Sequence, residues 1–428
     1  MSVFDRPLEI DPSRRFTVAA IILFLLGFLP MPLGSMATVA FSTAALAALL
    51  LLAIRSVPFE MPAPAGFAVG ATLFYFAVDL LSPLLYENRA ESWRPIVTSL
   101  QFLLFPVLLV VLRTARADPI AVFVRGARIG AIIGGVIAVI QVADGFDRAI
   151  GGAVSSFPFG AVAAWLTAVS LLGIGNARWG ERIFAAIAFS GGLAAAILSE
   201  SRGVWLALPV LAVIALVYFR ARYGGKVAGT GAAALGAVGL AVLIMAGDSV
   251  RERFSETLVM FEGFEFGQAD RETSDDEYSL DQRVLMLSYG LEAVVDRPIA
   301  GYGLHNAVAE VRARAAEDGY RIDDFNHLHN EYLTETVSNG LIGLTSLLLL
   351  LAAPLVVAYR SARDATYPER VALAWFMSAG SATFGLTSLA FGHDITNTVF
   401  VSGLLVVCLS AAKAGPRVAA DRAPGRSA

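Results

Sequence analysis

Residues 337–358 read VSNGLIGLTSLLLLLAAPLVVA and carry no charged side chain. A helix of about 20 such residues spans the hydrocarbon core of a bilayer. Eleven further windows have a similar apolar composition, and 57% of all residues are hydrophobic. The twelve cores lie near 16–33, 36–54, 64–83, 96–112, 120–142, 156–174, 182–198, 203–219, 226–247, 337–358, 369–391 and 396–411. The sequence therefore predicts an all-α polytopic membrane protein with about 12 transmembrane helices.

A long polar segment, residues 248–336, separates the ninth apolar window from the tenth. It is far longer than the connections that usually join neighbouring helices. We therefore expect one large helical loop outside the bilayer, between helices 9 and 10. The expected organisation is transmembrane helices 1–9 in 1–247, the loop in 248–336, transmembrane helices 10–12 in 337–411 and a tail in 412–428.

The distribution of basic residues predicts which helix ends face the cytoplasm, because short cytoplasmic segments are enriched in lysine and arginine. With the N-terminus placed inside, the inner segments hold twenty Lys and Arg residues. The short outer loops hold four, Arg89, Arg94, Arg148 and Arg202. The remaining eight of the 32 lie in the long loop. Both termini and the tail are therefore expected in the cytoplasm, and the long loop on the outer face.

The composition of the outer loop argues against several classes of partner. The loop carries 20 acidic residues and eight arginines, which makes it a poor surface for nucleic acid or anionic lipid headgroups. Cys408, the single cysteine, lies in the last apolar window, so no disulfide supports the loop. The chain shows no dinucleotide, phosphate-loop or zinc fingerprint, and we expect no cofactor.

Periodicity within the outer loop predicts two helices. Residues 267–280 are polar and indicate a mobile linker. From Asp281 onward, apolar residues recur at helical spacing and indicate an amphipathic helix suited to the membrane interface. These residues are Val284, Leu287, Leu291, Val294 and Val295. Pro298 and the following glycine turn, 301–303, end this helix, and a second helix is expected over 305–317.

The end of the loop, residues 323–333, reads DDFNHLHNEYL and is rich in polar side chains. Histidine has an unperturbed pKa near neutral pH, so His329 at a membrane surface is a candidate general base. His327 and His329 also suggest a metal site, but the neighbouring ligands do not show a known spacing. Capping or packing at the start of helix ten is the structural alternative for His329. We expect His305 to begin a helix, and Glu331 to orient or solvate helix ten.

Two arginines are candidates for binding an anionic group. Arg202 lies in a hairpin between helices seven and eight, beside a helix start whose free N–H groups favour anions. Arg283 lies at the beginning of the amphipathic helix. The alternatives are an interfacial anchor paired with Glu200 for Arg202, and a solvated residue paired with Asp281 or Glu292 for Arg283.

Three further features have both functional and structural interpretations. Asp79 in helix three indicates an ion pathway or, with Ser82 near the outer face, a structural role. His393 in the last outer loop lines the same cavity as His329 or is an ordinary polar loop residue. A glycine repeat at four-residue spacing is most simply explained by close helix packing. Its members are Gly126, Gly130 and Gly134.

Three stretches between about residues 196 and 345 resemble the bacterial O-antigen ligase and O-antigen polymerase superfamily. They read LSESRGVWLAL, QRVLMLSYGLEAVVDRPIAGYGLHN and HLHNEYLTETVSNGLIGL. The last is the most specific, since a His-Asn pair is followed by an apolar helix that contains Gly340 and Gly343. Outside this region the likeness is one of topology, with about twelve helices and one large periplasmic loop late in the chain.

The resemblance implies a glycosyltransferase of the bacterial inner membrane. Such enzymes transfer a glycan from undecaprenyl pyrophosphate to an acceptor hydroxyl without a metal, by inverting displacement. By motif, Arg202 and Arg283 would hold the pyrophosphate, and His329 would activate the acceptor. The supporting candidates are Asn330, His327 and His393. The implied partners are the lipid-linked donor, a glycan or lipid A-core acceptor and membrane lipids, with no nucleic acid.

An outer loop that precedes the long one, 143–155, is short and holds one arginine, Arg148. Several polymerases of the superfamily are described with two sizeable arginine-bearing loops, which favours ligase-like chemistry or a polymerase of an exopolysaccharide type. The alternative to a ligase is an O-antigen or exopolysaccharide polymerase. A twelve-helix secondary transporter is the distant alternative. Such transporters usually consist of two related six-helix halves, which this chain does not show. A non-enzymatic assembly protein would leave the outer arginines and His329 without a purpose.

Overall fold

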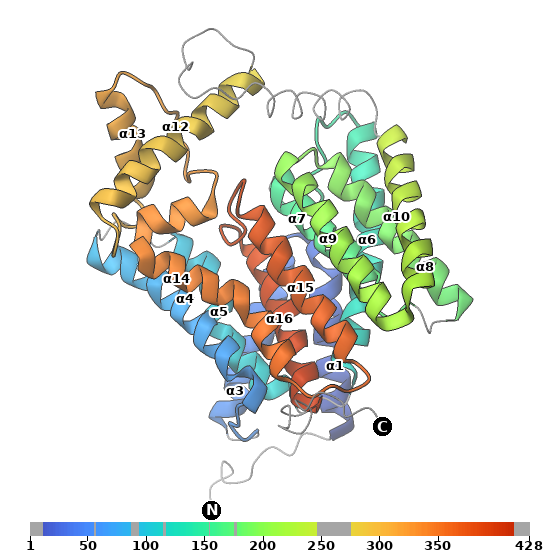
Figure 1. Ribbon diagram of the computed structural model, residues 1–428. Helices are drawn as coiled ribbons and strands as arrows, with labels where there is room; N and C mark the ends of the chain where they lie inside the picture. The colour runs from blue at the N-terminus through green and yellow to red at the C-terminus, as the bar shows by residue number, and fades with distance from the viewer. Residues whose placement is uncertain are drawn as a thin grey trace, which may run out of the picture.

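The structure, a computed structural model, describes residues 12–54, 57–86, 94–113, 117–153, 155–174, 178–245 and 275–414, and this part of the chain is built from helices without a β-strand (Figure 1). The all-α expectation is therefore confirmed, and a helix covers most of each apolar window. In the first half the helices are α1 (Pro12–Phe28), α2 (Pro30–Leu33), α3 (Met36–Ala53), η2 (Ala63–Ala65), α4 (Gly66–Leu85), α5 (Arg94–Leu112), α6 (Pro119–Ala143) and α7 (Ser156–Ser170). They continue as α8 (Trp179–Leu198), α9 (Arg202–Tyr223), α10 (Gly225–Met245), α12 (Asp275–Asp296), α13 (Ala307–Glu317), α14 (Glu331–Arg360), α15 (Tyr367–Phe384) and α16 (Asp394–Ala414).

Seven of the described helices are long and apolar enough to cross a bilayer. These spans are Met36–Ala53, Ala63–Leu85, Pro119–Ala143, Trp179–Leu198, Arg202–Tyr223, Glu331–Arg360 and Asp394–Ala414. Three shorter apolar helices are Thr17–Phe28, Ile96–Leu112 and Ser156–Ser170. The chain is therefore a multi-helix membrane protein, while the number of twelve spans stays a prediction.

Helix boundaries differ from the sequence expectation in three places. Helix α12 begins at Asp275, so the last six residues of the expected linker are helical. Acidic residues at its start favour a helix N-terminus electrostatically. Residues 248–274 lie outside the described part of the chain. Helix α14 begins at Glu331, six residues before the predicted apolar core, and α15 ends at Phe384, before the end of its window.

Helix α16 forms the centre of the bundle (Figure 1). It contacts α1, α3, α5, α6, α7, α14 and α15 and is buried along almost its whole length. Its polar side chains find partners on early helices. The Asn397 amide donates to the Thr98 carbonyl at 2.7 Å, and the Thr398 and Thr38 hydroxyls lie 2.8 Å apart. Such pairs satisfy groups that lipid cannot solvate.

The glycine repeat of α6 confirms the expected close helix packing, and the partner of Gly126 and Gly130 is α1. A Cβ on Gly126 would lie 2.2 Å from the Phe24 carbonyl oxygen, and one on Gly130 would lie 2.8 Å from that of Phe28. Helices α1 and α6 therefore pack backbone to backbone, in the manner of small-residue contacts between membrane helices.

Helix α14 is broken at Gly340, which has φ 65° and ψ −159°. The break leaves backbone groups on both sides without partners in their own helix. The turn that follows α12, residues 297–304, supplies them. Its Tyr302 and Gly303 N–H groups donate to the Val337 and Ser338 carbonyls at 2.9 and 2.7 Å. These four bonded residues lie on the outer-loop side of the break.

The membrane side of the break is satisfied in the same way. The Leu341 N–H donates to the Pro298 carbonyl at 2.7 Å. Gly301 fits against the break with φ 65°, and a Cβ there would lie 2.5 Å from the Val337 carbonyl oxygen. The expected turn glycines are therefore confirmed, and they dock the outer loop onto a discontinuous membrane helix.

Two arginines that counted as cytoplasmic charges hold the ends of helices. Arg128 is nearly fully buried, and its guanidinium donates to the Ser170 and Leu172 carbonyls at 3.0 and 2.8 Å. The Ser170 carbonyl lies at the last residue of α7, and the Leu172 carbonyl follows it by two residues. These hydrogen bonds explain why the charged side chain of Arg128 is found inside α6. Basic side chains commonly satisfy the last carbonyls of a helix.

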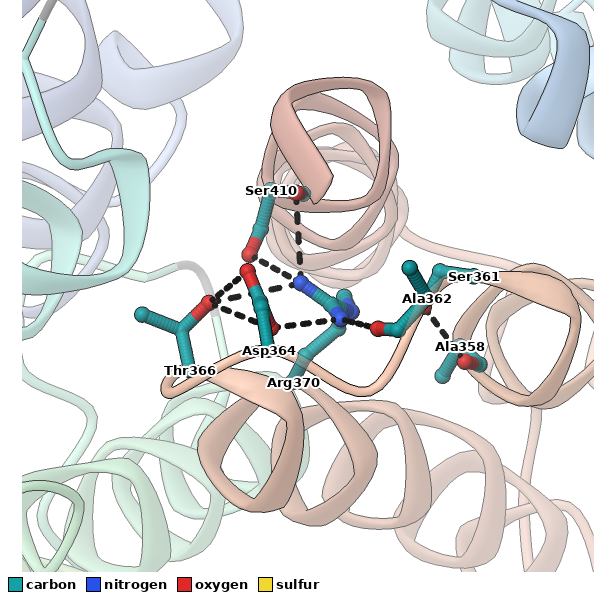
Figure 2. Close-up of polar contacts among 7 residues, drawn as sticks. All are labelled: Ala358, Ser361, Ala362, Asp364, Thr366, Arg370 and Ser410. Carbon is teal, nitrogen blue, oxygen red and sulfur yellow. Dashed lines mark hydrogen bonds and ion pairs between the residues drawn. The ribbon is translucent and has the colours of Figure 1, made fainter. Parts of the chain in front are cut away.

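Arg370 also binds backbone carbonyls near helix ends, and its hydrogen bonds join three segments of the chain (Figure 2). Its fully buried guanidinium donates to both the carbonyl and the hydroxyl of Ser410 on α16, at 3.2 and 3.0 Å. It also donates to the Ala362 carbonyl at 2.7 Å and pairs with Asp364 at 2.9 Å. The α14–α15 connection is thereby joined to the end of α16.

The break in α14 makes a prediction for Gly340→Ala. Only glycine readily adopts the Gly340 conformation, and a Cβ there would lie 2.1 Å from the Ile299 carbonyl oxygen. We expect a loss of roughly 1–3 kcal/mol of stability, since strained positions cost about this much. The measurement is the melting temperature of the purified protein in detergent.

The matched control is Gly70→Ala, because a Cβ at Gly70 in α4 would meet no atom within 4 Å. It should melt like the wild type. An unchanged melting temperature for Gly340→Ala would contradict the account of the break.

Candidate active site

Arg202 is the first residue of α9 and follows a tight turn after α8. Glu200 in this turn has φ 48°, and the Ser201 carbonyl accepts the Val204 and Trp205 N–H groups at 3.0 and 3.1 Å. The turn therefore fixes the start of α9. A helix N-terminus of this kind carries partial positive charge, which the guanidinium of Arg202 reinforces.

Arg283 lies near Arg202 although 81 positions separate them in the chain. Its side chain keeps contact with solvent. Partial desolvation and then the positive charge of Arg202 lower the pKa of Arg283. A guanidinium stays charged despite such a shift. The structure therefore brings both sequence-predicted arginines into one strongly positive region.

The two histidines of the loop end belong to the same region. The His327 and His329 rings are 4.4 Å apart between centroids. Burial lowers the pKa of His329 to about 4, and the charge of Arg283 contributes. Burial lowers the pKa of His327 to about 3, with contributions from His329, His393 and Arg283. Both rings are therefore neutral at pH 7, the form in which an imidazole accepts a proton.

His393 joins the group from the segment between α15 and α16. Burial lowers its pKa, while the neighbouring Asp394 acts in the opposite direction. Its ring lies 6.3 Å from that of Phe157, and its backbone carbonyl accepts the Asn397 N–H at the start of α16. The charge of His393 contributes to the lowered pKa of His327, so these two side chains interact, while a cavity shared with His329 stays a prediction.

Two residues of this region have a backbone conformation that is strained for any residue other than glycine. Among the described residues other than glycine, the two with positive φ are Glu200 at 48° and His329 at 51°. One lies two residues before Arg202, and the other is the candidate base itself. Strained residues persist only where surrounding structure holds them, and they gather at functional sites.

Glu331 holds the segment that carries His393. It is only 2% exposed, and its two carboxylate oxygens accept the Ala390 and Phe391 N–H groups at 3.0 and 2.8 Å. Its own N–H donates to the Gly385 carbonyl at 2.8 Å. Of the two alternatives for Glu331, to orient or to solvate helix ten, the structure supports the first, because the side chain is buried and each of its oxygens accepts a hydrogen bond.

The neighbours of Glu331 continue the connection. Asn330 caps α14 by accepting the Leu333 N–H at 3.0 Å, and its amide donates to the Leu386 carbonyl at 3.3 Å. Segment 385–393 also touches the Arg202 turn, because a Cβ on Gly203 would lie 1.9 Å from the Thr387 hydroxyl oxygen. One segment thus contacts the starts of both α9 and α14.

Other candidates from the sequence lie elsewhere. His305 is exposed in the turn before α13 and makes no contribution to the shifted histidines. Asp79 is buried inside the bundle and accepts the Ser99 hydroxyl at 2.6 Å, which supports its structural interpretation. Within the described residues, no group of three or more His, Cys, Asp or Glu side chains is arranged to hold a metal ion.

The cluster comprises two guanidinium groups and three imidazoles drawn from four segments of the chain. A family model described as O-antigen ligase matches residues 183–348, from α8 to the middle of α14. The matched region covers less than half of the chain, and over these residues the chain is similar to the O-antigen ligase family. Arg202, Arg283 and His329 lie inside the matched region, whereas His393 lies beyond it.

The chain is also similar to an uncharacterized protein of Haemophilus influenzae. The two are 23% identical over 233 residues, which is 53% of this chain and 57% of the relative. The match thus spans little more than half the length of each protein. The name of this relative specifies neither an activity nor a substrate.

The hydrogen bonds of Glu331 make a prediction for Glu331→Gln. Glutamine keeps one acceptor oxygen but turns an amide group toward the other N–H donor. A hydrogen bond contributes about 0.5–1.5 kcal/mol, so the loss of one should let the Ala390 and Phe391 amides exchange with deuterium up to roughly tenfold faster. Hydrogen–deuterium exchange of the peptide that covers 385–393 measures this.

Glu335→Gln is the control, because Glu335 is equally buried but bonds to the side chains of Tyr75 and Asn339. That variant should leave exchange in 385–393 unchanged. Equal protection of this segment in Glu331→Gln and the wild type would show that Glu331 does not hold it.

Proposed function

We propose that the protein transfers a glycan from undecaprenyl pyrophosphate to an acceptor hydroxyl at the outer face of the bacterial inner membrane. The single observation that carries the proposal is the composition of the site. The charged groups that shift the pKa values of Arg283, His327 and His329 are all arginines or histidines, and Arg283, His327 and His329 themselves lie in a loop that is otherwise strongly acidic. Such a site favours an anion with several negative charges.

The arginines suit the leaving group. In the proposed reaction the acceptor oxygen forms a bond to the anomeric carbon, and the bond from that carbon to the phosphate oxygen breaks. The electron pair leaves with undecaprenyl pyrophosphate, whose charge Arg202 and Arg283 stabilise through forked hydrogen bonds. Attack from the opposite side inverts the anomeric configuration, and the arginines take the part that a metal has in other phosphate chemistry.

His329 suits the role of general base that receives the acceptor proton. Its pKa near 4 keeps the ring neutral and ready to accept. A bound pyrophosphate would offset the positive charge of Arg283, and this would raise the pKa of His329 toward neutrality. The donor thereby strengthens the base at the moment when the acceptor must lose its proton. General bases typically contribute 10²–10⁴-fold to a rate.

The acceptor is proposed to be the lipid A-core, as for a ligase, with a growing polysaccharide as the alternative for a polymerase. Both reactions need the loop in the periplasm and both termini in the cytoplasm, in agreement with the distribution of arginine and lysine. The direct test is transfer by purified protein from a lipid-pyrophosphate glycan, with analysis of the product on each acceptor.

The first prediction for this reaction concerns His329→Ala. This variant should lose transfer by about 10²-fold or more while it still binds the donor, since a base acts in the transition state. His327→Ala, which leaves the proposed base in place, should lose less. Full activity of His329→Ala would exclude His329 as the base.

The pH dependence tests the same assignment. A group with a lowered pKa loses its proton-accepting form only when the pH falls through that lowered value. With subsaturating donor, the wild-type rate should therefore stay level through pH 6.5 and fall toward pH 4. An acid limb centred near the ordinary histidine pKa would contradict the environment assigned to His329.

The second prediction concerns lysine at the two arginines. Arg202→Lys and Arg283→Lys keep the charge but lose the planar fork, so each should reduce transfer by roughly tenfold or more. Arg321→Lys is the control, because Arg321 is highly exposed and pairs only loosely with Asp323, at 4.0 Å. Wild-type transfer by both site variants would overturn the pyrophosphate assignment.

A further inference from the structure

Helix α12 presents a stripe of exposed apolar side chains on its second half. Leu291 is 54% exposed and Val295 76% exposed, and Leu287 continues the stripe one turn earlier. Ile299, in the turn after the helix, extends it and is 66% exposed. The four-residue spacing places these side chains along one face of the helix.

The other faces of α12 are already used. Met286, Tyr289 and Ala293 are buried in a small apolar core that the helix shares with α13 and the start of α14. Two charged residues, Glu292 and Asp296, lie along the edge of the stripe, and Asp296 pairs with Arg314 of α13 at 2.7 Å. The stripe is therefore an outward apolar face with a polar border, as in helices that lie at a membrane interface.

The stripe continues into the apolar surface of the membrane-spanning helices. The turn that contains Ile299 is bonded to α14 next to Leu341, which is itself exposed. On the other side, the Tyr86 hydroxyl donates to the Ala300 carbonyl at 3.0 Å. Leu85, the last residue of α4, is 70% exposed beside it. In Figure 1, one end of α12 lies over the ends of α4 and α14.

We propose that the second half of α12 is embedded in the outer leaflet, with its apolar stripe among lipid acyl chains. The stripe is continuous with the apolar surface of the membrane-spanning helices, and this continuity identifies lipid as the molecule that covers it. Leu85 and Leu341 belong to helices long and apolar enough to span the bilayer, so a surface that extends theirs meets the same lipid. An interfacial helix buries its apolar face about 5–10 Å below the headgroup boundary.

Embedding α12 also sets the depth of Arg283, which precedes Leu287 by one turn of the same helix. Its guanidinium then lies at the level of the lipid phosphates. The pyrophosphate of a membrane-anchored donor lies at this level too. This last step rests on the proposed function, whereas the depth of α12 does not depend on it.

The experiment uses spin labels on the full-length protein in lipid nanodiscs. Cys408 is fully buried, so a single new cysteine is the only residue to be labelled. Labels at Leu291→Cys and Val295→Cys are compared with a lipid-facing reference, Leu84→Cys, and a water-facing reference, Glu317→Cys. Collisions with oxygen report hydrocarbon, and collisions with a water-soluble nickel chelate report water.

The expected result is high oxygen and low nickel accessibility at Leu291 and Val295, as at Leu84 and opposite to Glu317. Nickel accessibility equal to that at Glu317 would overturn the proposal. Low accessibility to both reagents would also overturn it, since a protein surface or a second copy would then cover the stripe. None of these outcomes depends on glycan transfer, so failure here and failure of the proposed reaction are distinguishable.

Discussion

The break of α14 at Gly340 is the constraint on which the outer half of the molecule depends. A continuous helix would use its own carbonyls and N–H groups and offer nothing to the loop. The break releases them on both sides, and the turn after α12 occupies them. No disulfide holds this loop, so main-chain bonds in a region of low dielectric take over that task. The position of Arg283 relative to His329 follows from this junction.

The candidate site is assembled from segments that are far apart in the chain. Segment 385–393 contacts the start of α9 through Thr387 and the start of α14 through the Glu331 carboxylate. These contacts leave little freedom at the two helix starts. The strained φ of His329 is compatible with this, because rigid surroundings can hold a backbone conformation that an isolated turn would avoid.

Sequence reasoning found what depends on local pattern. Apolar length located the helices, four-residue spacing identified Gly126 as part of a close helix contact, and motif order singled out Arg202 and Arg283. It missed features that depend on what a distant segment provides. Gly340 resembles any glycine of a membrane helix until residues 297–304 are placed against it. For Glu331 the sequence left orientation and solvation open, and only the Ala390 and Phe391 amides decide between them.

Charge counting had the same limit. Arg128 and Arg370 entered the count as charges of the inner segments, but counting gives no information on partners. In the structure both are buried and hydrogen-bonded to carbonyls near helix ends, so they join helices. The number of membrane spans was also beyond pattern alone, because several apolar helices are shorter than a bilayer crossing.

The central position of α16 has a consequence for biosynthesis. Thr398 on this helix meets Thr38, which is 360 residues earlier in the chain. At typical translation rates of roughly 5–20 residues per second, the early helices wait for about 20–70 s before their central partner exists. During that interval the groove that α16 will fill must be occupied by lipid or by a chaperone of membrane insertion. The bundle is therefore completed only late in synthesis, and its earliest helices remain without their central partner for the longest time.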